Sequence, residues 1–416
     1  MSTGGRYVMD IEKVKSYAEL IVKVGANVQP GQDVIIQAEL DQPDFVTLMV
    51  EQCYLAGAAD VRVEWSHQPL QLLNVKYKEP DRLGKIENWE KEKLLFRAEK
   101  LPAMIYLESA DPNGLDGMDQ EKWGKAVQMR WGVIKPIRDS MENKYQWCIA
   151  AVPGKAWAKK VFPELSEDAA MEKLWEAILY TSRADIDGVK AWKEHNSDLK
   201  HRCEYLNSLE LRKLKYKSSN GTDFTVGLIP QAMFMAGAEK TLGREVVYNP
   251  NIPSEEVFIS PMKGEAEGIV YSTRPLSYRG VMIENFSIRF ENGKVTEVHA
   301  EKNEDALKTM VKMDEGASML GECALVPYDS PIRNSGIMFY NTLFDENAAC
   351  HLALGDGFCN CIRDYEKYSL EECRAMGINV SMIHEDFMIG SEDLDITGIT
   401  ASGEEIKIFK NGNWAF

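Results

Sequence analysis

The first hundred residues alternate between two hydrophobic spacings. One stretch repeats apolar residues at the intervals of a helix, at Ile11, Val14, Ala18, Ile21 and Val24. A second helix is predicted to begin near Pro43, because proline is favoured in the first helical turn. Short apolar runs typical of buried strands occupy positions 34–36, 61–65 and 103–107. Strands separated by helices predict an α/β N-terminal domain with a mainly parallel sheet.

The second half of the chain changes to the spacing of hairpins. Dipeptides typical of tight turns lie between apolar runs at positions 220–221, 292–293, 402–403 and 411–412. One helix is predicted over about 304–320. We therefore expect an α+β C-terminal domain rich in antiparallel hairpins. A length of 416 residues favours two domains, and the boundary is predicted near residue 200, between domains 1–200 and 201–416.

Charge and composition narrow the class of partner. The 48 basic and 65 acidic residues give a formal net charge of −17, which repels nucleic acid and anionic membranes and attracts cations. Residues 1–7 have no apolar core like that of a secretory signal, and no stretch approaches the roughly 20 apolar residues of a membrane span. We expect a cytoplasmic protein that binds neither nucleic acid nor membrane. Its eight scattered cysteines favour reduced thiols.

Residues 384–386 read His-Glu-Asp within an apolar stretch. Residues two apart on a strand share a face, so His384 and Asp386 can bind one ion while Glu385 points away. A histidine in an apolar strand can also be a core residue whose nitrogens are hydrogen-bonded. The carboxylate two residues on makes metal binding an equal alternative, because a buried, ionised aspartate is costly unless it is paired or bound to metal.

A second candidate cluster occupies residues 344–355. We interpret it as a helix start followed by a short apolar helix, with His351 in its body and Gly355 at its end. Glu346 and His351 would then be separated by about 140° around the helix, and would share a site only if Glu346 lay at or before the first turn. The alternative role for Glu346 is an interaction with the helix dipole at the N-terminus.

Three further carboxylates, those of Glu255, Glu256 and Glu322, stand beside apolar runs. Adjacent residues on a strand face opposite ways, so only one of Glu255 and Glu256 can face a given site. The spacing leaves that choice open. Each of these carboxylates can also lie in water, at a strand edge or a turn.

Four motifs occur in order along the chain, at residues 251–258, 321–326, 344–355 and 384–391. Together they resemble the M29 family of metalloaminopeptidases, the aminopeptidase T and aminopeptidase S group, and the resemblance extends through 147–151 and 156–157. It implies an N-terminal α/β domain beside a metal-binding C-terminal domain, a homodimer, and removal of N-terminal residues with broad preference. It also implies a two-metal site with the ligands Glu256, Glu322, Glu346, His351, His384 and Asp386. The resemblance thus selects Glu256 over Glu255.

This ligand set predicts a particular chemistry. Four carboxylates and two imidazoles suit zinc, cobalt or manganese better than a metal that prefers thiolates. Two such ions would share a water, lower its pKa and polarise the carbonyl of the peptide bond. We expect Glu322 to bridge them and Glu255 to act as a catalytic base that binds no metal, on peptides with a free N-terminus. The chain contains neither HExxH nor Gly-x-Ser-x-Gly, which excludes the common single-zinc and serine hydrolases.

One position departs from the family pattern. Seven residues after His351 the family carries a tyrosine, in a stretch like Leu-Gly-Ser-Ala-Tyr, whereas residues 354–358 read Leu-Gly-Asp-Gly-Phe. A phenol there suits a hydrogen bond to a developing oxyanion, worth on the order of 10²–10³ in rate, and Phe358 cannot donate one. Two alternatives therefore stay open. One is a mononuclear, non-hydrolytic enzyme, such as an iron dioxygenase that uses His351, His384 and Asp386; the other is a metal-binding homologue without activity.

Overall fold

A computed structural model describes residues 11–185 and 187–416. Contacts within the chain divide it into two compact units. The first comprises Met1–Asn196 and Ala238–Ser254, and the second comprises Ser197–Gly237 and Glu255–Phe416. The hydrophobic pattern does not indicate this return of a later segment to the first unit, and the domain boundary near residue 200 stays a prediction. Residues 1–7, where no secretory signal is predicted, lie outside the described residues.

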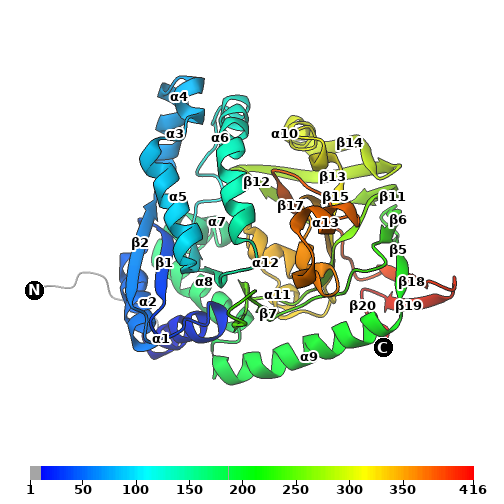
Figure 1. The fold of residues 1–416 in the computed structure, drawn as a ribbon, viewed down its shortest axis with the longest axis horizontal. Coiled ribbons are helices and arrows are strands. Elements are labelled where there is room, and N and C mark those ends of the chain that lie inside the picture. Colours follow the sequence, from blue (N-terminus) through cyan, green and yellow to red (C-terminus); the bar gives the residue numbers. More distant parts are fainter. Residues whose placement is uncertain (1–10, 186) are drawn as a thin grey trace, which may run out of the picture. The chain divides into compact units, whose positions relative to one another are not determined.

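The first unit is built around a parallel sheet with the strand order β2-β1-β3-β4-β9. Figure 1 labels β1 and β2 of this sheet. Its strands are β1 (Asp33–Glu39), β2 (Asp60–Ser66), β3 (Ala103–Glu108), β4 (Trp147–Ala151) and β9 (Asn251–Ile252). Two helices precede the first strand, α1 (Ile11–Leu20) and η1 (Ile21–Gly25). The helices that follow are α2 (Pro43–Leu55), α3 (Gln68–Tyr77), α4 (Pro80–Gly84), α5 (Asn88–Lys100), α6 (Gln120–Met141), α7 (Lys155–Val161) and α8 (Glu167–Thr181). A small antiparallel pair, β7 (Glu239–Lys240) and β8 (Val247–Tyr248), belongs to the returning segment. The predicted parallel α/β architecture is confirmed.

Local sequence explains how these elements begin. Pro43 is the first residue of α2, where its missing N–H costs nothing. Ser166 caps α8 by accepting a hydrogen bond from the N–H of Ala169 at 3.3 Å. The strands β1 and β3 are buried along most of their length, because crossover helices cover both faces of a parallel sheet.

The second unit contains two antiparallel sheets. The larger consists of β5 (Leu211–Lys217), β6 (Asp223–Leu228), β11 (Pro261–Tyr271), β12 (Leu276–Tyr278), β13 (Val281–Glu291), β14 (Lys294–Lys302), β18 (Asp395–Thr400), β19 (Glu405–Lys410) and β20 (Asn413–Trp414). The smaller has the order β10-β15-β16-β17 and consists of β10 (Val257–Ile259), β15 (Leu320–Leu325), β16 (His351–Gly355) and β17 (His384–Met388). All four predicted tight turns join paired strands. The antiparallel character predicted for this half is confirmed.

Short helices connect the strands of the second unit. They are α10 (Glu304–Met310), η2 (Gly316–Ser318), α11 (Pro331–Asn334), α12 (Thr342–Glu346), η3 (Cys359–Cys361), η4 (Tyr365–Lys367) and α13 (Leu370–Ala375). The long helix α9 (Gly188–Ser208) runs across the boundary between the units. All eight cysteines lie within the described residues as buried free thiols. Among the helices that the structure describes, none is both long and apolar enough to cross a membrane.

The helix predicted over 304–320 is wrong beyond Met310. There α10 ends, and a single 3₁₀ turn, η2, follows before β15 begins. Asp314 accepts a hydrogen bond from the N–H of Ala317 at 2.8 Å and so starts that turn. A Cβ on Gly316 would lie 1.9 Å from the carbonyl oxygen of Val380. The backbone here packs against another segment too closely for a continuous helix with side chains.

The prediction that His351 lies in a helix is also wrong. The chain leaves α12 after Glu346, and His351 is the first residue of β16. A short apolar run without polar alternation is compatible with a buried strand and with a buried helix. Here pairing with strands on both sides decides for the strand, and every residue of β16 is buried.

A buried ion pair anchors α12. Arg274 Nη1 donates to Asp345 Oδ1 at 2.9 Å, and the two side chains are 9% and 4% exposed. The same carboxylate accepts hydrogen bonds from the N–H groups of Phe339 and Asn341. Burial raises the pKa of Asp345 to about 6 against the opposing charge of Arg274. This pair fixes the helix that carries Glu346.

Removing Arg274 should therefore destabilise the protein. Arg274→Ala leaves the Asp345 carboxylate buried without its cation, and we expect the free energy of unfolding in urea to fall by about 3–5 kcal/mol. Lys215→Ala is the control, because Lys215 and Glu405 form an exposed pair at 2.8 Å, and exposed ion pairs contribute little to stability. Equal losses in the two variants would contradict an anchoring role for the buried pair.

Candidate metal centre

The four-stranded sheet has one apolar face and one polar face. Alternate residues such as Cys323, Leu352 and Phe387 belong to the core of the second unit. The residues between them face the other way. Glu322 pairs with Ala353, and Ala353 pairs with Asp386, so the two carboxylates stand in one row with only a methyl group between them.

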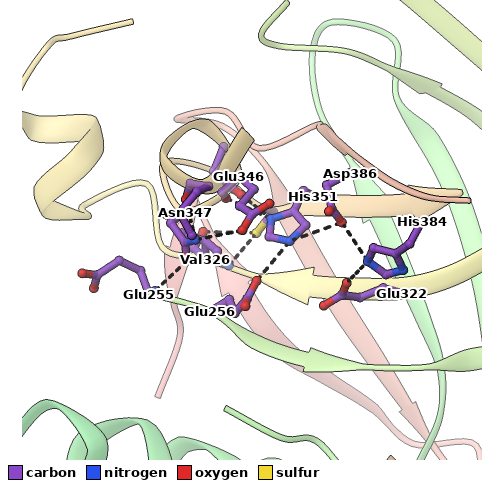
Figure 2. Close-up of polar contacts among 12 residues, drawn as sticks. Glu255, Glu256, Glu322, Val326, Glu346, Asn347, His351, His384 and Asp386 are labelled. Carbon is purple, nitrogen blue, oxygen red and sulfur yellow. Dashed lines mark hydrogen bonds and ion pairs between the residues drawn. The ribbon is translucent and has the colours of Figure 1, made fainter. Parts of the chain in front are cut away.

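The two histidines lie in the rows on either side of that row. His351 pairs with Ala324 and His384 pairs with Gly355. Ala324 and Gly355 are small and leave space for the imidazole rings, while on its other side His351 pairs with Met388. Figure 2 shows the two rings and the Asp386 carboxylate pointing toward one another. His384 and Asp386 thus share a strand face, as their spacing predicts.

Glu385 lies on the opposite face of β17. It pairs with Leu354, a residue of the core. Burial raises the pKa of Glu385 to about 7, and the charge of Arg279 opposes the rise. Its direction away from the cluster agrees with the expected alternation of a strand.

Glu256, and not Glu255, joins the cluster. Glu256 stands immediately before β10, and its Oε2 lies 3.1 Å from His351 Nε2. Figure 2 shows the Glu255 side chain directed away from the histidines. The main-chain N–H of Glu255 donates to Asn347 Oδ1 at 2.7 Å. The geometry therefore makes the choice between the two glutamates that their spacing left open.

Backbone carbonyls fix the orientation of both imidazoles. His351 Nδ1 lies 2.9 Å from the carbonyl oxygen of Glu346, and His384 Nδ1 lies 2.7 Å from that of Asp356. A carbonyl only accepts, so each Nδ1 carries the hydrogen. Each Nε2 then faces a carboxylate, at 3.1 Å for His351 and Glu256 and at 3.0 Å for His384 and Glu322. A proton or a metal ion has to lie between these atoms.

Two groups of potential ligand atoms emerge within the described residues. Glu256, Glu322 and His351 form one, and Glu322, His384 and Asp386 form the other; in each group the ligand atoms lie within 4.8 Å of one another. Glu322 belongs to both groups. Glu346 belongs to neither, but Figure 2 shows its carboxylate beside His351. Its pKa is raised well above the usual value, first by burial and then by the charges of Asp386 and Glu256.

Burial and the close approach of charged groups shift the pKa values of several residues in the cluster. Burial raises the pKa of Glu322 to about 7 against a hydrogen bond from His384. For His351, burial favours the neutral ring, but the hydrogen bond and charge of Glu256 outweigh it and raise the pKa to about 10. Burial acts to raise the pKa of Asp386, but the positive charge of His384 outweighs it and lowers that pKa. Without metal, protons on the histidines balance the buried negative charge.

The side chains present fit divalent metal ions. Asp386 Oδ1 is buried without a hydrogen-bond partner among the described residues, 3.5 Å from His384 Nε2 and 4.0 Å from His351 Nε2. An unpartnered, buried carboxylate oxygen aimed at two imidazole nitrogens is costly unless a cation joins them. Carboxylates and imidazoles are the donors that zinc, cobalt and manganese accept. Histidines held through Nδ1 by carbonyls are typical of metal ligands.

Two neighbours of the cluster escape sequence reasoning as supporting residues. Asn347 is fully buried and bonds both Glu255 and Glu346. The carbonyl of Asp356 holds His384. Their only signal in the sequence is position, since each lies in or directly after the motif that carries Glu346 and His351. Phe358, which the sequence singles out, packs its ring against His384 with 4.8 Å between ring centroids.

Comparison with known proteins identifies the family of this chain. Residues 10–414 match the family described as thermophilic metalloprotease (M29). Aminopeptidase AmpS of Bacillus subtilis is 41% identical over 97% of this chain and 99% of its own length, and aminopeptidase T of Thermus thermophilus is 37% identical over 96% and 98%. The solved structure of wild-type AmpT from Thermus thermophilus superposes with a TM-score of 0.87 at 36% identity, covering 98% of this chain and 100% of that one. The chain therefore belongs to the M29 family of metalloproteases and is a hydrolase of peptide bonds.

Proposed function

We propose that the protein is an aminopeptidase that removes the N-terminal residue of peptides at a centre of two divalent metal ions. The observation that carries this proposal is the pair of ligand groups that share Glu322. A single ion would use one group and leave the carboxylates of the other buried without a counter-charge. The names of the similar proteins, aminopeptidases AmpS and T, support the choice of terminal over internal cleavage.

The proposed ligands divide between the two positions. Glu256 and His351 would hold one ion, with Glu346 beside them. His384 and Asp386 would hold the other, and Glu322 would bridge. Zinc, cobalt and manganese all accept these donors. The homodimer and the cytoplasmic location stay predictions.

When bound, two such ions supply a shared water of lowered pKa and polarise the carbonyl of the bond to be cut. The protein's own groups do the positioning. The carbonyls of Glu346 and Asp356 hold the imidazoles so that each Nε2 faces the site. The net charge of −17 draws in substrates that carry an α-ammonium group.

Glu255 stays our proposal for a catalytic base that binds no metal. It is buried and stands next to the proposed ligand Glu256 in the sequence. A carboxylate outside the ligand set keeps the ability to take up a proton when the ions are in place. Its backbone bond to Asn347 fixes where the side chain starts.

The mononuclear alternative fits less well. An iron centre of His351, His384 and Asp386 would leave Glu256 and Glu322 buried within hydrogen-bonding distance of the imidazoles without a role. Membership of a peptidase family also favours hydrolysis. The inactive homologue is a distinct outcome of the experiment below.

Activity should depend on two equivalents of metal and on a free substrate amine. We expect metal-free protein to regain activity as zinc, cobalt or manganese is added, with the rate reaching its plateau at about two ions per chain. Release of free amino acid from unblocked peptides measures the rate, and the N-acetylated peptides serve as the control. A plateau at one ion, equal cleavage of blocked peptides, or two bound ions without turnover would each refute the proposal.

Metal binding should release protons and strengthen as the pH rises. His351, with a pKa of about 10 in the metal-free protein, is protonated at pH 7, and Nε2 has to lose that proton before it binds an ion. We expect the apparent affinity to rise about tenfold per pH unit for each proton displaced, between pH 6 and 8. Titration calorimetry in buffers with different heats of ionisation counts the protons. Metal binding that releases no protons would contradict a protonated His351 in the metal-free protein.

The same protons should stabilise the metal-free fold at low pH. The folded pKa values of His351 and Glu322 are both raised, to about 10 and about 7, so the folded state binds more protons than the unfolded state. Their contribution is fully present below the unfolded pKa values and is lost as the pH rises through the folded ones. Metal-free protein should therefore melt at a lower temperature at pH 8 than at pH 6, and added metal should reduce the difference.

Phe358→Tyr should raise kcat. The Phe358 ring lies against His384, so a phenol oxygen at its tip would be added next to the proposed centre. A single hydrogen bond to the developing oxyanion contributes up to about 10²–10³ in rate. Phe258→Tyr is the matched control, because Phe258 packs edge-on against Phe358 at 5.5 Å between centroids and adds the same oxygen one ring away. An unchanged kcat in Phe358→Tyr would dispose of the missing-donor idea.

A further inference from the structure

Three strand ends meet at one edge of the four-stranded sheet. Here β15 begins, β16 ends and β17 begins, as the pairs Leu320 with Leu354 and Gly355 with His384 show. Strand β16 separates the other two, so Glu322 and His384 come from strands that do not pair with each other. Strand pairing alone therefore does not set the 3.0 Å between His384 Nε2 and Glu322 Oε2.

Four polar residues join the chain segments at this edge. We call them the edge clamp: Asp314, Asp356, Asn379 and Ser381. Asp314 precedes β15, Asp356 follows β16, and Asn379 and Ser381 precede β17. Clamp residues therefore lie before the two strands that supply this ligand group, β15 with Glu322 and β17 with His384 and Asp386, and directly after β16 between them.

Asp314 binds two segments at once. Its Oδ1 accepts from the N–H of Ala317, at 2.8 Å, and from the hydroxyl of Ser381, at 2.8 Å. Its Oδ2 accepts from the N–H of Met382 at 2.6 Å. Ala317 leads into β15, and Ser381 and Met382 lead into β17. One carboxylate thereby fixes the entry to the strand of Glu322 relative to the entry to the strand of His384.

Asp356 completes the connection from β16. Its Oδ1 accepts from the N–H of Ser381 at 3.0 Å, and its own N–H donates to the carbonyl of Ile383 at 2.7 Å. Its carbonyl accepts from His384 Nδ1 at 2.7 Å. Three hydrogen bonds therefore connect Asp356 to residues 381–384, the segment that ends at His384.

Asn379 and two glycines bring the backbones together. Asn379 Nδ2 donates to the carbonyls of Gly316 and Gly355, at 2.9 and 2.6 Å. A Cβ on Gly321 would lie 2.1 Å from the carbonyl oxygen of Asp356, and one on Gly316 would also overlap its neighbour. The segments lie in contact at the backbone, so a change in a clamp bond is passed directly to β17.

The other half of the centre has its own support. His351 Nδ1 is held by the carbonyls of Glu346 and Ala349, at the opposite end of β16 from the edge clamp. The hydrogen bonds of Asp314 lead to Ala317, Ser381 and Met382, and those of Asp356 lead to Ser381, Ile383 and His384. The two histidines are therefore positioned by different parts of the chain.

We propose that Asp314 and Asp356 are positioning residues that, by holding His384, set the metal affinity of the Glu322, His384 and Asp386 group more strongly than that of the other group, in which Glu256 and His351 share Glu322. This inference rests on the proposed two-metal function. Loss of a clamp bond lets the start of β17 shift, which moves His384 Nε2 away from Glu322. Supporting residues of this kind typically change metal affinity by 10- to 100-fold.

The test is a metal titration of full-length, metal-free variants against a competing chelator, with zinc and with cobalt. Asp314→Asn replaces the oxygen that accepts from Met382 with an amide, and Asp356→Ala removes the acceptor for Ser381. We expect each to weaken one of the two binding steps by about 10- to 100-fold and to leave the other within about threefold. The absorption of bound cobalt should change for the weakened step only. Asp356→Asn keeps an acceptor oxygen and should restore wild-type binding.

Asp393→Asn is the matched control. Asp393 also holds a turn, through Ser218, Ser219 and Ser391, beyond the other end of β17, and should leave both binding steps unchanged. Thermal unfolding of each metal-free variant separates loss of stability from loss of affinity. If Asp356→Ala does not fold, Asp314→Asn decides, since it changes one atom.

Two outcomes would overturn the positioning role. In one, both clamp variants fold and bind both ions like the wild type. In the other, both binding steps weaken together in proportion to stability, as for any destabilised variant. A wild-type chain that binds fewer than two ions would instead refute the proposed function, and that result is read from the unmutated protein alone.

Discussion

Mutual repulsion between buried carboxylates is the constraint on which the second unit depends. Glu256, Glu322 and Glu346 are each less than a tenth exposed, and Asp386 stands in the same cluster. Ionised carboxylates at this density are unfavourable without positive charge among them. The raised pKa values of Glu322 and His351 are the response of the metal-free protein. Two imidazolium groups balance only part of this buried negative charge, so the folded protein favours the binding of further cations.

The four-stranded sheet carries these charged side chains on one face and still packs its other face in the hydrophobic core. Strand alternation gives β15, β16 and β17 an apolar face that packs in the interior and a polar face that carries the cluster. Ala353 and Gly355 keep the centre of the polar face open. The ion pair of Arg274 and Asp345 anchors α12, the helix that ends at Glu346. The position of Glu346 therefore does not depend on a bound metal ion.

Sequence patterns predicted the architecture well and the local structure near the site less well. Alternating helices and strands, and turn dipeptides such as Asn220-Gly221, are local signals, so the parallel and antiparallel sheets could be read from them. The short apolar run after His351 carries no period that separates helix from strand. Its state depends on pairing with β15 and β17, which are distant in sequence. The close approach of Gly316 to Val380, beyond the end of α10, likewise joins segments that are distant in sequence.

The candidate ligands divide along the same line. The shared face of His384 and Asp386 follows from strand spacing alone. The choice of Glu256 over Glu255, and the meeting of Glu322 with both histidines, depends on long-range strand register that no spacing contains. Asn347 and Asp356 were missed as supporting residues because they act through the backbone of others. Glu322 is present in both groups, so in the proposed two-metal centre a substitution that alters its basicity would change metal preference at both positions at once. Selection for a different metal at one position alone would have to act on the histidines and their carbonyl partners instead.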